Sequence, residues 1–152
     1  MKSILIITCI ITFAISCNNA GNNNTTKQDE PKTHADSLLK DVMDGHDVAM
    51  AKMMKLSAAQ KQLQQALDSI NKLPEKAKKA AADYTTRLDA LQEKMKFADS
   101  TMNKWMTEFS YDSATTGANS TPYLESESKK ISNVKEAILS ALQKADSLFK
   151  KP

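Results

Sequence analysis

The regular spacing of apolar side chains is the feature that most constrains the fold of this 152-residue chain. From Leu39 to Ile70, one helical face recurs at alternating steps of three and four residues, with His46 and Gln60 among otherwise apolar positions. This spacing persists over about five heptads and predicts one amphipathic helix across residues 36–72. Gly45 is its weakest position, because glycine costs about 1 kcal/mol relative to alanine inside a helix.

A break at Leu73-Pro74 ends this helix and begins a second one over residues 74–109. Proline is tolerated in the first turn of a helix, where its missing N–H has no partner to lose. The spacing of three and four returns from Ala77 to Phe109. The next stretch, "SYDSATTGANST", has the composition of a turn and predicts a loop.

A third helix is expected over residues 122–149, with Thr121 as its cap and Pro122 in its first turn. Its apolar seam consists of Ile131, Val134, Ile138, Ala141, Ala145 and Leu148. The short break makes the first two helices antiparallel, and the third can cover their open face. The sequence therefore predicts an all-α protein, an antiparallel three-helix bundle with coiled-coil-like packing over residues 36–150. We favour a monomer, and the alternative is a homodimer in which two hairpins form a four-stranded coiled coil.

The amino-terminal segment has the features of an export signal. Its apolar run over residues 4–15 is too short to span a bilayer as a helix. The run ends at "AISC", which resembles the bacterial lipobox, whose cysteine receives a diacylglycerol before the preceding peptide is removed. Ala14 departs from the motif, which prefers leucine there. We predict a signal peptide over residues 1–16 and a lipid on Cys17; an ordinary signal peptide and a short membrane anchor are the alternatives.

Residues 17–35 are rich in Asn, Gly and Thr and nearly free of apolar side chains, which predicts a flexible tether that contains His34. The formal net charge of +3 is spread over interspersed acids and bases. Nucleic-acid binding requires a concentrated basic face, so this class of function is excluded. We expect attachment to the cell membrane or outer membrane, facing the periplasm, with an envelope protein as a further partner.

Methionine and histidine gather in one half of the predicted bundle, beginning with "DGHDVAMAKMM" in the first helix. Folding the second helix back at the proline break, with equal rise in both, places His46 near Met102 and Val42 near Trp105. Seven side chains are then expected to converge: Met43, His46, Met50, Met53, Met102, Trp105 and Met106.

Four interpretations suit this cluster, and we favour the first. Methionine can fill irregular gaps in a core and contact Trp105 and Phe109 through sulfur. Thioether and imidazole groups also suit Cu(I), and the candidate ligands are His46, Met50, Met53, Met102 and Met106. A haem held between helices is the third interpretation, and an apolar ligand or partner is a further possibility. No cofactor is expected under the favoured interpretation.

Enzymatic chemistry has little support in this sequence. The predicted domain contains one histidine, His46, and no cysteine, and it has neither a Gly-rich phosphate loop nor a G-x-S-x-G motif. We predict no catalytic residue and no enzyme. The expected function is a structural or interaction module, and the alternative is a periplasmic Cu(I)-binding protein.

Three segments also resemble a known group of proteins: "HDVAMAKM" (His46 to Met53), "MNKWMTEF" (Met102 to Phe109) and the last helix. They look like small helical lipoproteins of Bacteroidota that are often labelled "viral A-type inclusion protein". The likeness covers residues 36–150 and the lipobox. It implies a helical envelope lipoprotein and assigns no catalytic residue.

Overall fold

The computed structural model describes residues 33–150 of the chain. This part consists of five α-helices and contains no strand: α1 (His34–Asn71), α2 (Glu75–Ala80), α3 (Ala82–Glu108), α4 (Tyr111–Thr115) and α5 (Ser120–Phe149). The prediction of an all-α protein is confirmed for these residues. The predicted signal peptide, Cys17 and most of the predicted tether lie outside the described residues.

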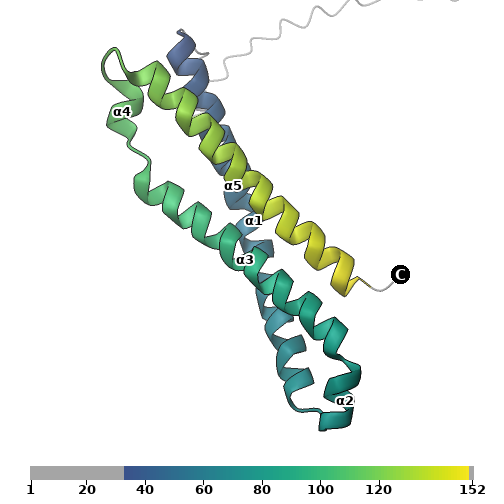
Figure 1. The fold of residues 1–152 in the computed structure, drawn as a ribbon. Helices are drawn as coiled ribbons and strands as arrows, with labels where there is room; N and C mark the ends of the chain where they lie inside the picture. The colour runs from purple at the N-terminus through teal and green to yellow at the C-terminus, as the bar shows by residue number, and fades with distance from the viewer. Residues whose placement is uncertain (1–32, 151–152) are drawn as a thin grey trace, which may run out of the picture.

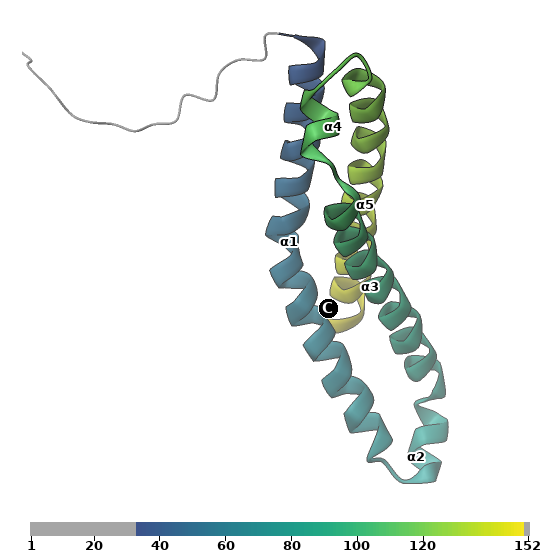
Figure 2. The same cartoon turned by 90° about the vertical axis from the view of Figure 1, so that its left-hand side faces the viewer.

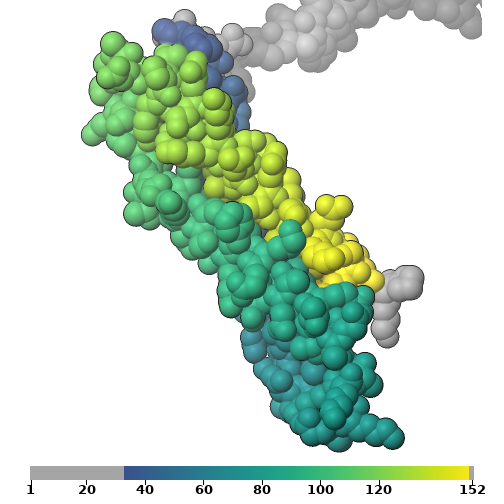
Figure 3. Space-filling model, viewed as in Figure 1, coloured from purple at the N-terminus to yellow at the C-terminus, as the bar shows by residue number. Residues whose placement is uncertain are grey.

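The three long helices lie side by side (Figures 1 and 2). α3 runs back along α1, and α5 runs in the same direction as α1. Contacts are most extensive between α1 and α5, then between α3 and α5. α5 ends part-way along the α1–α3 hairpin, so the end of the hairpin that carries α2 extends beyond it (Figure 3).

α1 begins at His34 because Thr33 caps it. The Thr33 hydroxyl accepts the backbone N–H of Asp36 at 3.1 Å, and the Asp36 carboxylate accepts the backbone N–H of Thr33 at 3.0 Å. This reciprocal capping box satisfies two donors that the first turn would otherwise leave free. The helix therefore starts slightly before the expected residue 36 and takes in His34, which was expected in the tether.

The segment expected as one helix over residues 74–109 is divided at Ala81. Ala81 has φ −90° and ψ 2°, and its N–H contacts the carbonyl oxygens of both Ala77 and Lys78 at 3.0 Å. This sharing tightens the last turn of α2 and ends it. None of the residues of α2 is buried, so packing does not hold it in line with α3.

The expected loop between the second and third helices contains the short helix α4. The Ser110 hydroxyl caps it by accepting the N–H of Ser113 at 3.2 Å. Gly117 follows with φ 83°, a conformation that glycine adopts readily, and α5 then begins at Ser120. Pro122 lies in the first turn of α5, as expected. The prediction of Thr121 as the cap is wrong, because Asn119 is the cap residue and Thr121 lies inside the helix.

Buried apolar side chains recur along each long helix at heptad spacing. In α1 they are Val42, Ala49, Leu56 and Leu63; in α3 Leu88, Leu91, Met95, Ala98, Met102 and Trp105; in α5 Leu124, Ile131, Val134, Ile138, Ala141 and Ala145. Between Leu63 and Leu88 no residue is buried, which is the part of the hairpin beyond α5. None of the helices within residues 33–150 has the length and apolar character needed to cross a membrane.

Candidate functional site

The predicted methionine and histidine cluster is distributed between the core and the surface. Met102 is fully buried, whereas Met50 and Met106 are exposed. Met53 and His46 are half-buried. The structure thus separates the thioethers of the cluster by their access to solvent and gives only Met102 a fully interior place.

His46 lies against Trp105, with 5.4 Å between the ring centroids. The expected partner of Trp105 was Val42, so the pairing of α1 with α3 is shifted by about one helical turn. The shift arises at the hairpin, where α2 and Ala81 replace the simple turn from which the pairing was predicted. The His46 Nδ1 lies 3.0 Å from a carboxylate oxygen of Asp47.

Trp105 is the centre of a row of aromatic rings that joins three helices. Its ring stacks on Phe109 at 4.9 Å between centroids, and Phe109 lies 6.1 Å from Tyr123 of α5. The Tyr123 hydroxyl accepts the backbone N–H of Ser110 at 2.7 Å, just before α4. This row, with His46 at its α1 end, fixes the carboxyl-terminal end of α3 against α1 and α5.

A buried carboxylate is the residue that the sequence analysis missed. Glu127 of α5 is only 2% exposed and lies between Leu124 and Ile131 in the buried seam. Lys130 donates to its Oε1 at 2.7 Å, while its Oε2 is buried without a hydrogen-bond partner among the described residues. Leu124, Glu127 and Ile131 continue the three-and-four spacing upstream, and this is the signal that could have placed Glu127 in the core.

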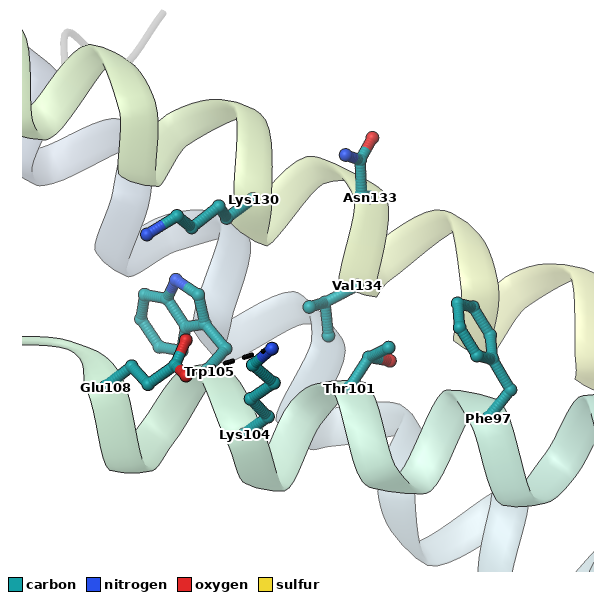
Figure 4. A pocket seen from close by; sticks show the side chains of 8 residues that line it. All are labelled: Phe97, Thr101, Lys104, Trp105, Glu108, Lys130, Asn133 and Val134. Carbon is teal, nitrogen blue, oxygen red and sulfur yellow. Dashed lines mark ion pairs between the residues drawn. The ribbon is translucent and has the colours of Figure 1, made fainter.

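A groove of about 370 Å³ lies between α3 and α5, beside this carboxylate. Its lining residues are Phe97, Thr101, Lys104, Trp105, Glu108, Lys130, Asn133 and Val134. Figure 4 shows Phe97 at one end, Val134 and Thr101 in the middle, and Trp105 with the charged side chains at the other end. We call this feature the Trp105 groove.

The polar end of the Trp105 groove holds a buried donor that has no acceptor. The Trp105 ring is 5% exposed, and its Nε1 is buried without a hydrogen-bond partner within residues 33–150. Figure 4 shows this nitrogen on the side of the ring that faces Lys130. Buried donors are nearly always paired, so an unpaired indole N–H beside an open groove marks a place where a ligand can supply the acceptor.

Two lysines give the same end of the groove a surplus of donors. The hydrogen bond to Glu127 raises the pKa of Lys130 above its ordinary value, so Lys130 is a cation at neutral pH. Lys104 lies 3.9 Å from Glu108, which is an ion pair at longer than hydrogen-bond distance. The groove therefore combines apolar walls with cations and N–H donors. This arrangement is suited to binding a small molecule that has an apolar part and a hydrogen-bond acceptor.

Among residues 33–150, no group of three or more His, Cys, Asp and Glu side chains is placed to hold a metal ion. A Cu(I) site built mainly from methionine thioethers is a separate case, because methionine is not among these side-chain types. The candidate ligands for such a site are His46, Met50, Met53, Met102 and Met106. Comparison of the chain with protein-family models, curated proteins and solved structures gives no match.

Proposed function

We propose that this protein is a lipid-anchored, non-enzymatic interaction module of a bacterial cell envelope. In this proposal Cys17 carries the lipid, residues 1–16 are removed, and the segment up to residue 32 is the tether. The helical part is an antiparallel three-helix bundle with coiled-coil-like packing that faces the periplasm. The lipobox at Cys17 and the resemblance to small Bacteroidota lipoproteins support this location.

The observation that carries the interaction role is the uncovered end of the hairpin. We define the hairpin tip as residues 64–87, between the buried Leu63 and Leu88. Its apolar side chains continue the seam of the core without being buried: Leu67, Ile70, Leu73 and Tyr84 are half-buried or exposed. An apolar seam that has helices on two sides and solvent on the third suits a docking helix of a partner.

The position of the tip suits a protein anchored at its other end. α1 has 38 residues, and a rise of 1.5 Å per residue separates its two ends by about 57 Å. Residue 33, where the proposed tether joins, lies at the end opposite α2 (Figure 2). An anchored molecule would therefore present the tip away from the membrane, towards a partner in the envelope.

A photo-crosslinking experiment in native cells tests this role. A photoreactive residue replaces Leu73 in the tip, and in a matched control it replaces Val48, which is also exposed but lies in the part of α1 beside α5. We expect one discrete adduct from position 73 and none from position 48. An adduct of twice the chain mass would identify the partner as a second copy. Equal, diffuse labelling from both positions would contradict the docking role.

The lipid anchor has its own test in intact-mass analysis of the protein from the same cells. We expect loss of residues 1–16 and a lipid mass on Cys17, together with release from the membrane fraction in the Cys17→Ser variant. Retention of Met1 would contradict the proposed processing.

Cu(I) binding is a second candidate, favoured by the surroundings of His46. Asp47 occupies its Nδ1 at 3.0 Å, which leaves Nε2 as the metal-binding nitrogen, and carboxylates commonly orient metal-binding histidines in this way. The nearby Trp105 ring offers its face to a cation, and Met50 is one turn from His46.

Titration with Cu(I) in the presence of a competing chelator tests this second candidate, with Trp105 fluorescence as the readout. The Cys9→Ser, Cys17→Ser double variant removes both thiols as competing ligands. We expect quenching that is lost in His46→Ala and kept in Met54→Ala, an exposed methionine of the same helix. The absence of quenching and of competition at micromolar copper would contradict the candidate.

A further inference from the structure

The Trp105 groove has the two chemically distinct ends of a site for an amphiphilic small molecule. Phe97 and Val134 supply an apolar wall, and Phe97 is 62% exposed although it is a large aromatic side chain. The other end is formed by Trp105, Lys104, Lys130 and Glu108 (Figure 4). A ligand that lies along the groove would contact both ends at once.

The donors at the polar end outnumber the acceptors available to them. Lys130 has three N–H donors, of which one is used by Glu127, and Lys104 lies beyond hydrogen-bond distance from Glu108. The Trp105 Nε1–H has no acceptor and faces Lys130. Two donors that face one another are both satisfied by a single oxygen placed between them, and a negatively charged oxygen satisfies them best.

Each acid at this end has a lysine as its counter-ion. Glu127 is buried, does not line the groove and pairs through its Oε1 with Lys130. Glu108 is the acid among the lining residues, and it forms a long ion pair with Lys104. Lys130 can share its remaining donors with a ligand without leaving Glu127, so the buried carboxylate keeps its cation. This arrangement favours an added anion over an added cation.

We propose that the Trp105 groove binds a small organic carboxylate with an aliphatic body, in a role separate from docking at the hairpin tip. The carboxylate accepts hydrogen bonds from Trp105 Nε1 and Lys130 and lies near Lys104. The aliphatic body lies along Val134 and Phe97. A groove of about 370 Å³ is within the range of small-molecule sites.

Calorimetric titration of the full chain carrying Cys17→Ser tests the proposal, with octanoate as the probe. The matched probes are 1-octanol, which has the same chain without the charge, and octylammonium, which has the opposite charge. We expect octanoate to bind at least about tenfold more tightly than either, the effect of a charge-assisted hydrogen bond. Trp105→Phe keeps a ring and removes the donor, and should weaken octanoate binding about tenfold or more.

Three further variants, one of them a control, protect the test against a folding defect in Trp105→Phe. Phe97→Ala changes an exposed side chain and should weaken both octanoate and octanol by about fivefold or more, through lost apolar contact. Lys104→Gln should weaken octanoate alone by about threefold. Lys96→Gln removes the same charge from the same helix outside the groove and should leave the binding of both probes unchanged.

Three results would each overturn the proposal. The first is the absence of octanoate binding up to about 10 mM. The second is equal affinity for octanoate and octanol. The third is a wild-type affinity for octanoate in both Phe97→Ala and Trp105→Phe, with their helix content unchanged.

Discussion

The two parts of the α1–α3 hairpin have the same sequence pattern and different surroundings. Where α5 lies along the hairpin, every second turn of α1 from Val42 to Leu63 contributes a buried side chain. Beyond the end of α5, the pattern continues through Leu67 and Ile70, yet none of these residues is buried. Two helices alone therefore do not bury a heptad seam in this protein. The third helix does so, and the hairpin tip lacks one.

The largest expected effect is on stability, and it compares two leucines of the same helix. Leu56→Ala should lower the free energy of unfolding by about 3 kcal/mol, because it leaves a cavity among three helices. Leu67→Ala should cost about 1 kcal/mol, because this side chain is only half-buried and is next to solvent. Urea unfolding followed by circular dichroism measures both values. Equal losses of unfolding free energy at Leu56 and Leu67 would contradict the difference in burial between the two parts of the hairpin.

The next effect concerns the buried carboxylate in the covered part. Lys130→Met should destabilise the protein by about 1–2 kcal/mol, because Glu127 would remain buried without its cation. Glu127→Leu should be neutral or stabilising, because an apolar residue then continues the seam. Lys129→Met, on the exposed face of α5, is the control for loss of charge. Similar losses of unfolding free energy in Lys129→Met and Lys130→Met would show that the ion pair between Lys130 and Glu127 adds nothing to stability.

The same pair gives a pH dependence with a definite sign. The pKa of Lys130 is raised in the folded protein. Its contribution to the free energy of unfolding is therefore complete below the pKa of the unfolded chain, about 10.4, and is lost as the pH rises through the pKa of the folded protein. The difference in stability between wild type and Lys130→Met should therefore stay constant up to about pH 10 and narrow as the pH rises further. Urea unfolding at each pH measures it. A difference in stability that stays constant as the pH rises above about 10 would contradict the expected direction of this pH dependence.

The smallest expected effect is at Gly45, where α1 approaches α5. An added Cβ would lie 3.1 Å from a methyl carbon of Ile131, so Gly45→Ala gains helix propensity and loses packing. We expect a net change within about 1 kcal/mol of zero. In an Ile131→Ala background the crowding disappears, and the same change should then stabilise by about 1 kcal/mol. An identical change in stability on Gly45→Ala in the two backgrounds would show that α1 and α5 are not tightly packed at Gly45.

The sequence predicted the long helices well because their signals are repeated many times. The seam from Leu39 to Ile70 and the break at Pro74 each have a local physical cause, periodic burial in one and a missing N–H in the other. The division at Ala81 has no such signal. Alanine and lysine around it favour helix, and the break follows from how the chain turns at the tip.

The candidate site was predicted only in part, for a related reason. The contact between the rings of His46 and Trp105 depends on the pairing of α1 with α3, and one extra turn of chain at the tip changes that pairing along the whole hairpin. Glu127 was missed because a charged residue normally marks an exposed face. Its burial depends on Lys130, which reaches it from the next turn, and on its place in the seam.

Hydrogen exchange measured by mass spectrometry can compare the hairpin tip with the part of the hairpin that α5 covers. The sample is full-length Cys17→Ser protein shown to be monomeric by light scattering. Amides of the covered part, from Val42 to Leu63 and from Leu88 to Trp105, should exchange slowly and together. Amides of the hairpin tip, residues 64–87, should exchange much faster, because opening this end exposes no buried side chain. Uniformly slow exchange through the tip would show that two helices close it without a third helix or a partner, the opposite of what we expect.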